Sequence, residues 1–143
     1  MPAYSQRSRD KLVTCDRRLQ EIFNEVIKHA DCTIVSAWRD KLEQDELLRT
    51  GKSQLAWPDS KHNHTDTRVW RSVAEQIPCS KAVDAMPYPI NWKDRERATL
   101  FAGLVLGIAA MLGHELRWGG DWDQDWEVID NSFDDLAHFE LVD

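Results

Sequence analysis

Two histidines and one isolated aspartate stand out in residues 60–89, SKHNHTDTRVWRSVAEQIPCSKAVDAMPYP. His62 and His64 come at the start of this stretch, and Asp84 comes near its end, in the apolar sequence A-V-D-A-M. A short apolar run of this kind is typical of a buried strand. A buried carboxylate is costly unless it is paired or bound to a metal. The partner of Asp84 could therefore be a basic side chain, backbone donors, or a metal with other ligands.

The chain has five histidines: His29, His62, His64, His114 and His138. His29 lies near the end of a predicted helix and His114 follows a helix-ending glycine, so surface or helix-dipole roles account for both. His138 differs, because it begins a predicted strand in D-D-L-A-H-F-E-L, three residues after Asp135. Its position makes it a candidate ligand with an acid close by.

A catalytic zinc site needs about three protein ligands, usually His with Asp or Glu, and an open position for water. It also needs a nearby carboxylate that takes a proton from that water. His62, Asp84 and His138 could supply the ligands, and Asp135 the base. From composition alone, a structural or surface role accounts better for any single histidine, so the neighbouring motifs must decide.

The bulk properties indicate one soluble globular domain. The chain has 143 residues, of which 42% are apolar and 30% charged, and this length allows one real core. No apolar run reaches the ~18 residues of a membrane span, so no stable membrane insertion is expected. The first residues are polar and lead into no apolar segment, so no signal peptide is expected.

Charge and cysteine usage exclude further classes. The net charge is −7 and no lysine- or arginine-rich block is present, whereas a non-specific nucleic-acid binder carries a basic face. The three cysteines are far apart and form no C-x-x-C pair, which argues against a disulfide framework and a cysteine-based zinc site. We therefore predict no nucleic-acid partner, and three small buried thiols.

Hydrophobic spacing predicts the elements that must position these residues. Helices are expected at residues 8–30, 40–50 and 94–112, and strands at 33–38, 81–86, 114–118 and 138–142. Residues 52–78 are polar and predict a long loop, with a helical turn around 69–76. The order of elements predicts an α+β fold, a single domain over residues 1–143 with a small antiparallel sheet packed against helices.

Several motifs occur in the order of a known family. S-K-H, A-V-D and D-L-A-H-F-E-L resemble those of zinc peptidases that include D-alanyl-D-alanine carboxypeptidases and phage L-alanyl-D-glutamate endopeptidases. S-A-W-R, G-K-S, A-V-D-A-M-P-Y-P-I-N-W and R-W-G-G-D-W follow the same order. The resemblance covers roughly Thr33 to Val142 and is greatest to the phage endolysins.

The resemblance implies roles for individual residues. His62, Asp84 and His138 match the zinc ligands in a cleft, and Asp135 matches the general base. Arg39 matches the family's arginine that approaches the substrate carboxylate or the developing oxyanion. Two further positions, Gln44 and Ser60, match residues that recur near the substrate. If Asp135 is not the base, Glu140 is the next candidate.

The chain departs from the family pattern at two places. Ala137 stands where the family usually has proline, which changes local stiffness and not the chemistry. Residues 64–78 are predicted to be a loop insertion between His62 and Asp84, and loops tolerate such insertions because closure entropy grows slowly with length. The insertion makes His64 a rival ligand, although the Ser-x-His motif favours His62.

The resemblance implies a monomeric zinc hydrolase that cuts the stem peptide of bacterial peptidoglycan. An endolysin of this kind stays in the host cytoplasm until the membrane is permeabilised and then reaches the cell wall. Two alternatives remain within the fold: a D-alanyl-D-alanine carboxypeptidase, and a catalytically silent wall-binding or virion-structural relative. A zinc-stabilised interaction module would instead want four closed ligands.

Residues 118–127 allow two further hypotheses. Alternating acids, Asp121, Asp123, Asp125 and Glu127, resemble the front half of a calcium loop, so Ca²⁺ is a candidate second ion. A full EF-hand loop would have glycine at Trp126 and glutamate at Ser132, and a solvated acidic loop is the alternative. Trp118, Trp122 and Trp126 recur every four residues, as glycan-binding rings or as packing side chains.

Overall fold

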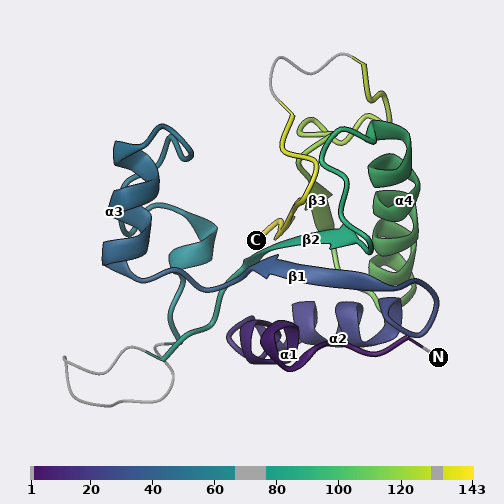
Figure 1. Cartoon of the computed structure of the whole chain (residues 1–143), viewed down its shortest axis with the longest axis horizontal. Helices are drawn as coiled ribbons and strands as arrows, with labels where there is room; N and C mark the ends of the chain where they lie inside the picture. Colours follow the sequence, from purple (N-terminus) through teal and green to yellow (C-terminus); the bar gives the residue numbers. More distant parts are fainter. Residues whose placement is uncertain (1, 67–76, 130–133) are drawn as a thin grey trace.

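The computed structural model describes residues 2–66, 77–129 and 134–143. In this part of the chain, β1 (Cys32–Ser36), β2 (Ala82–Pro87), β3 (Leu116–Trp118) and β4 (His138–Leu141) form one sheet in the order β1-β2-β4-β3 (Figure 1). Each neighbouring pair is antiparallel. The predicted α+β class, its small antiparallel sheet and the four predicted strands are confirmed.

Alternation along the strands separates a core face from a polar face. Val83, Ala85, Phe139 and Leu141 belong to the main hydrophobic core. Because successive side chains of a strand point to opposite faces, Asp84 lies on the other face of the sheet. Asp84 pairs with His138 across β2 and β4, which places both side chains on that face.

The helix α4 (Arg95–Met111) covers part of the core face. It begins after Asp94, an N-cap whose side chain accepts a hydrogen bond from the Arg97 amide. It packs against α2, β2 and β3. Phe101 of α4 meets the ring of Phe139 edge-on at 6.2 Å, and Phe139 meets Phe23 of α2 at 5.8 Å.

The prediction of one helix over residues 8–30 is wrong. The chain forms α1 (Gln6–Leu12) and α2 (Arg17–Val26) instead. Between them the Asp16 amide donates to the Ser80 carbonyl, and the Ser80 amide donates to the Thr14 carbonyl. Asp16 then caps α2, since its side chain accepts from the Arg18 amide. The break therefore depends on a contact with residues far along the chain.

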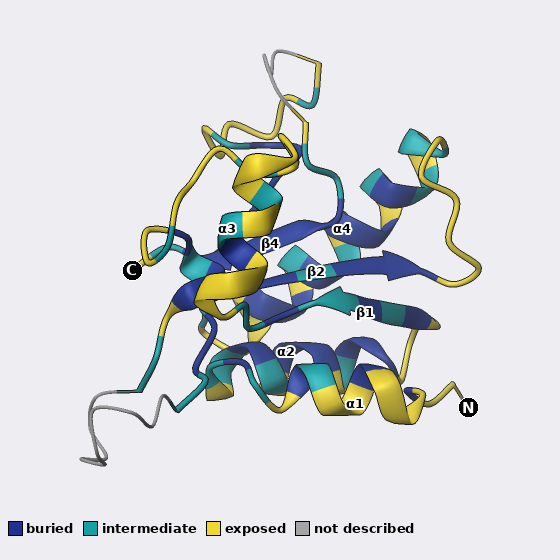
Figure 2. Cartoon of the chain, turned by 60° about the vertical axis from the view of Figure 1, so that its left-hand side comes forward, coloured by how far each residue is buried: buried dark blue, intermediate teal, exposed yellow. Residues whose placement is uncertain are grey.

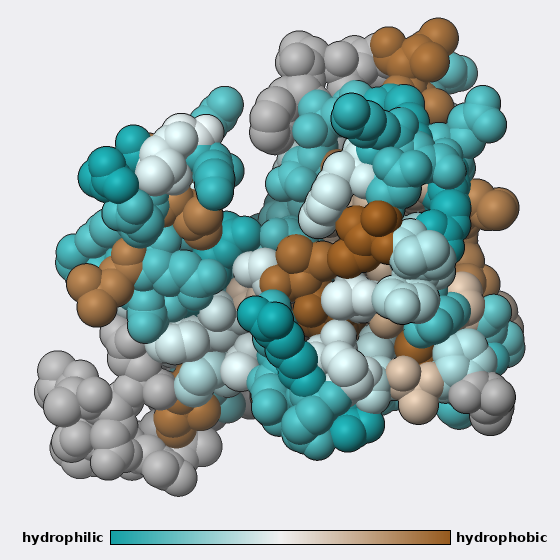
Figure 3. Space-filling view, in the orientation of Figure 1, coloured by the Kyte–Doolittle hydropathy of each residue, from teal (hydrophilic) through white to brown (hydrophobic). Residues whose placement is uncertain are grey.

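The helix α3 (Lys41–Arg49) confirms the helix predicted at 40–50. It is followed by Gly51, whose φ of +77° suits a helix-ending glycine. Together with the following loop and the short 3-10 helix η1 (Lys61–Asn63), α3 forms a lobe beside the sheet (Figure 1). Most residues of α3 and of the loop are exposed (Figure 2). In the space-filling view a notch separates the upper part of this lobe from the body of the molecule (Figure 3).

The ends of the loop insertion lie together. Thr65 and Pro78 form an isolated antiparallel bridge, and the Asp66 amide donates to the Ile77 carbonyl. The helical turn predicted at residues 69–76 lies outside the described residues. The three cysteines are buried free thiols, as predicted. None of the helices in the described residues has the length and apolar character needed to cross a membrane.

Candidate metal centre and active-site cleft

Three side chains predicted as zinc ligands converge on the polar face of the sheet. Asp84 comes from β2, His138 from β4 and His62 from η1. Asp84 Oδ1 lies 3.4 Å from His62 Nε2 and 3.3 Å from His138 Nδ1. One ligand atom from each residue lies within 4.8 Å of the others, so the group could hold a metal ion. The β2–β4 register brings Asp84 and His138 together, although they are far apart in the sequence.

The hydrogen bonds of His62 fit a metal ligand. Its Nδ1 lies 2.7 Å from the Ala37 carbonyl oxygen, which can only accept, so Nδ1 carries the proton. In the neutral imidazole the lone pair is then on Nε2, a buried atom with no hydrogen-bond partner. Second-shell bonds of this kind fix which imidazole nitrogen binds a metal. An unpartnered lone pair beside Asp84 and His138 is the donor that zinc requires.

Asp84 is the anionic member of the group. Burial alone would raise the pKa of Asp84, but the neighbouring His62 and His138 outweigh burial and hold that pKa well below its usual range. Arg39 also contacts it, with one guanidinium nitrogen 3.0 Å from Asp84 Oδ2. Asp84 is thus hydrogen-bonded to Arg39 and His138, and His62 Nε2 lies beside it.

The chain places Arg39 on a wall of the cleft. Its Nε donates to Ser36 Oγ at 3.1 Å, and its backbone amide donates to the His62 carbonyl. The cleft has a volume of about 500 Å³ and is lined by the loop after α3, η1, Trp122, Asp135, His138 and Glu140. It lies where the α3 lobe meets the body, beside the notch in Figure 3.

Ser60 and Gln44 have different positions relative to this cleft. Ser60 lines it, and its Oγ accepts from the His62 amide at 3.2 Å. Gln44 is completely buried and does not line the cleft. Its amide donates to the Leu55 carbonyl at 2.6 Å and its oxygen accepts from Asn63. Any effect of Gln44 on a substrate would therefore act through the loop that it holds.

Asp135 lines the cleft together with His62 and His138. Burial, and next the charge of Asp84, raise the pKa of Asp135 above the ordinary value, which makes it a stronger base. The Asp135 amide donates to the Gly119 carbonyl at 2.8 Å, and its own carbonyl accepts from the His138 amide at 3.0 Å. Its backbone is thus tied to both neighbouring strands.

Gly119 is a site residue that the sequence motifs did not single out. A Cβ atom built there would overlap the carbonyl oxygen of Asp135. The glycine therefore allows the Asp135 segment to approach the end of β3. The pair G-G in R-W-G-G-D-W was the only sign of this in the sequence. The structure is needed to show which segment approaches the glycine.

The three regularly spaced tryptophans differ in their surroundings. Trp118 is buried and donates from its indole to the Leu136 carbonyl, and Trp126 is 73% exposed. Trp122 lines the cleft with its ring centre 5.4 Å from that of His138. Packing accounts for Trp118, whereas Trp122 could contact a substrate.

The acidic loop brings together three of its four carboxylates. Oxygens of Asp121, Asp123 and Asp125 lie within 4.8 Å of one another, without Glu127. Asp121 is buried, and its two oxygens accept from the amides of Asp125 and Trp126. These bonds account for the turn by themselves, and calcium binding stays a prediction.

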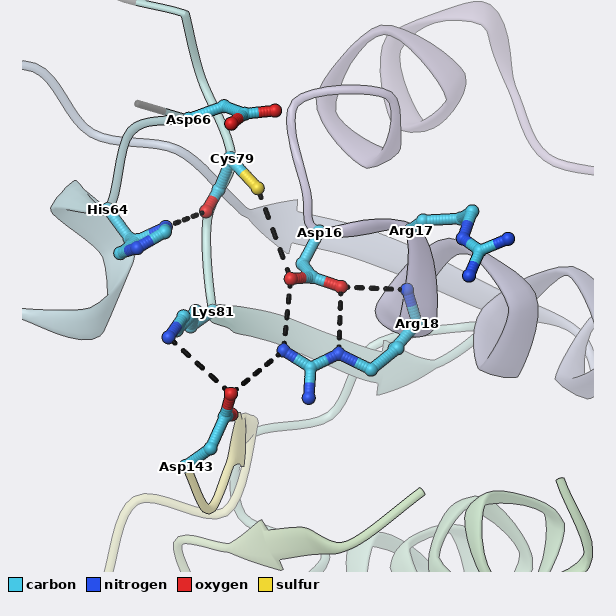
Figure 4. A pocket seen from close by; sticks show the side chains of 8 residues that line it. All are labelled: Asp16, Arg17, Arg18, His64, Asp66, Cys79, Lys81 and Asp143. Atoms are coloured by element: carbon cyan, nitrogen blue, oxygen red, sulfur yellow. Dashed lines mark hydrogen bonds and ion pairs between the residues drawn. The ribbon is translucent and has the colours of Figure 1, made fainter. Parts of the chain in front are cut away.

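The rival ligand His64 lies in a second pocket, of about 480 Å³, shown in Figure 4. Its Nδ1 lies 2.9 Å from the Cys79 carbonyl oxygen, and it is not part of the His62 group. The pocket is lined by ion pairs, in which Arg18 contacts both Asp16 and Asp143 at 3.1 Å. This position supports His62 over His64 as the ligand.

Comparison with known proteins places the chain among the peptidases. Residues 2–142 match the family described as phage L-alanyl-D-glutamate peptidase, so the chain belongs to that family. This confirms the resemblance found in the motifs. Among solved structures, the chain is similar to the L-Ala D-Glu endopeptidase ChiX of Serratia marcescens, with a TM-score of 0.70 and 20% sequence identity over 98% of this chain and 90% of that chain. At this identity the likeness concerns the fold. A comparison with curated proteins gave no match.

Proposed function

We propose that the protein is a zinc-dependent peptidoglycan hydrolase that cuts the bond between L-alanine and D-glutamate in the stem peptide. The observation that carries the proposal is the unpartnered Nε2 of His62, which faces Asp84 and His138 in a cleft also lined by Asp135. Three ligands with an adjacent carboxylate are the requirements of a catalytic zinc site. Family membership supports the choice of bond.

A zinc ion held by His62, Asp84 and His138 would supply Lewis-acid chemistry, polarising a carbonyl and lowering the pKa of a water molecule toward ~7. Asp135 accepts the proton of the attacking water and later returns it to the leaving amine. The guanidinium of Arg39 stabilises negative charge that develops on the substrate oxygen. Trp122 and the loop after α3 hold the peptide against these groups.

Product analysis on purified peptidoglycan tests the proposal. The zinc-loaded protein should release fragments with a new amino-terminal glutamate, and chelator treatment should stop the release until zinc is restored. Free D-alanine as the product would instead identify a carboxypeptidase. Binding to the wall without hydrolysis would identify a silent relative, and stable zinc without either activity would identify an interaction module.

The biological role that fits this activity is that of a phage endolysin in host lysis. The protein would stay in the host cytoplasm until the inner membrane is permeabilised and would then act on the cell wall. The expected partner is peptidoglycan, and the expected state is a monomer. Light scattering after gel filtration, together with lysis of permeabilised and intact cells, checks the state and the route.

A further inference from the structure

Glu140 lies two residues after His138 in β4, on the same polar face of the sheet. Its Oε1 lies 2.8 Å from His138 Nε2. The other oxygen of Glu140 lies beside the cations Arg117 and Lys61, so the carboxylate is the acceptor and His138 Nε2 is the donor of this hydrogen bond. A metal ligand is a neutral imidazole, and in that form the lone pair of His138 is on Nδ1, the nitrogen that faces Asp84.

We infer that Glu140 is a positioning residue that fixes the imidazole of His138 so that Nδ1 binds the metal. The inference rests on the proposed function, because it gives Glu140 a role toward the zinc ligand. Carboxylates that accept from a metal-bound imidazole orient the ring and strengthen it as a ligand. Without Glu140 the ring could present either nitrogen to the cleft.

The orientation of Glu140 is itself fixed by two cations. Its Oε2 lies 2.9 Å from a guanidinium nitrogen of Arg117 and 3.1 Å from Lys61 Nζ. Arg117 is the register partner of Glu140 across β3 and β4. Lys61 directly precedes His62 in η1. One carboxylate thus joins the two segments that carry the histidine ligands.

These contacts argue against Glu140 as the general base. Both of its oxygens are engaged by His138, Arg117 or Lys61, and the residue is only 8% exposed. A base must be free to accept a proton from water in the cleft. Asp135 is better placed for that step, and Glu140 acts through His138.

Zinc affinity, measured by competition with a chelator, tests this role. Glu140→Gln removes the charge and turns an amide group toward two cations, and Glu140→Asp keeps the charge but shortens the side chain. Each should weaken zinc binding by ~10–100-fold, while circular dichroism shows a retained fold. Glu115→Gln is the matched control, because Glu115 is an exposed acid just before β3, and it should bind zinc as the wild type does.

Nitrogen NMR of the zinc-loaded wild type gives a readout that needs no variant. His138 should show zinc at Nδ1 and a proton at Nε2, and binding through Nε2 would overturn the inference even if neither variant folds. Unchanged zinc affinity in folded Glu140→Gln would overturn it as well. If the wild type hydrolyses peptidoglycan with zinc and Glu140→Gln keeps its zinc affinity, this inference is refuted and the proposed function is not. A wild type that binds no zinc would refute the proposed function with it.

Discussion

At the scale of single residues, the sequence motifs predict which side chains form the candidate site, whereas the contacts that orient them are seen only in the fold. The motifs predicted His62, Asp84, His138 and Asp135 as one group, and the structure places them around one cleft. The Ala37 carbonyl that orients His62 could not be predicted, because a backbone oxygen leaves no mark in residue types. The link between Glu140 and His138 likewise requires strand geometry.

The choice between His62 and His64 can be decided by metal analysis. His62→Ala should lose stoichiometric zinc, because it removes the unpartnered Nε2 beside Asp84. His64→Ala should keep zinc, because His64 lies in the separate pocket beside Cys79. Zinc content by atomic emission after dialysis checks both variants. Loss of zinc from His64→Ala alone would reverse the assignment.

Asp135→Asn should keep the fold and the zinc but lose most of the hydrolysis. The amide cannot accept the proton of water, and general-base catalysis contributes ~10²–10⁴-fold. The rate of peptidoglycan hydrolysis, compared at equal zinc content, is the measurement. Asp134→Asn changes a neighbouring acid that pairs with Arg95 and should be close to wild type in rate. Near-normal turnover of Asp135→Asn would remove Asp135 from the mechanism.

At the scale of elements, local patterns predicted the strands and missed the first helix break. Apolar spacing continues from Leu12 through Leu19 to Val26, so a single helix was a reasonable prediction from residues 8–30 alone. The break depends on Ser80, whose backbone bonds to Thr14 and Asp16. A contact between such distant residues leaves no periodic pattern in the sequence. The strands β2 and β4, in contrast, have an apolar pattern that can be recognised within a few residues.

Asp16, the N-cap of α2, should make a contribution to the free energy of unfolding that depends on pH. Asp16→Ala should lower the free energy of unfolding by about 1 kcal/mol near neutral pH, the usual cost of removing an N-cap. Burial raises the pKa of Asp16, but hydrogen bonds from Arg18 outweigh it and lower that pKa overall. The stabilisation is therefore present above the unfolded pKa of ~3.9 and is lost as the pH falls through the folded pKa.

Urea unfolding at neutral and acidic pH measures this difference. The gap between the wild type and Asp16→Ala should shrink at acidic pH. Asp31→Ala is the control, since Asp31 is an exposed acid that caps no helix. An unchanged gap from neutral to acidic pH would mean that the Asp16 carboxylate does not stabilise the helix through its charge.

The approach of the Asp135 segment to the end of β3 is a second feature at this scale. Gly119→Ala places a methyl group against the Asp135 carbonyl and should push that segment from its hydrogen bonds with Gly119 and His138. We expect hydrolysis to fall by at least ~10-fold, since small displacements of a catalytic group are costly. Gly103→Ala, in α4 with open space around it, is the control. Full activity of Gly119→Ala would show that the loop adapts freely.

At the scale of the whole molecule, the candidate metal centre joins parts that are distant in the sequence. Its three ligands come from η1, β2 and β4, and the loop after α3 completes the lining of the cleft. The class of fold could be predicted from the order of elements. The position of the lobe could not, because residues 52–66 have no periodic pattern and are held by buried polar bonds such as those of Gln44.

Zinc should therefore stabilise the entire fold. A ligand that binds only the native state adds RT ln(1 + [L]/Kd), about 2.7 kcal/mol at 100 times the Kd. For a chain of this size that free energy corresponds to a rise in Tm of roughly 5–10 °C. Differential scanning calorimetry with zinc and with a chelator measures the shift, and His62→Ala should show none because it lacks one ligand. The zinc-loaded protein should give one transition, since unfolding any of the three elements releases the ion. A wild-type Tm that does not depend on zinc would contradict a site assembled from these three residues.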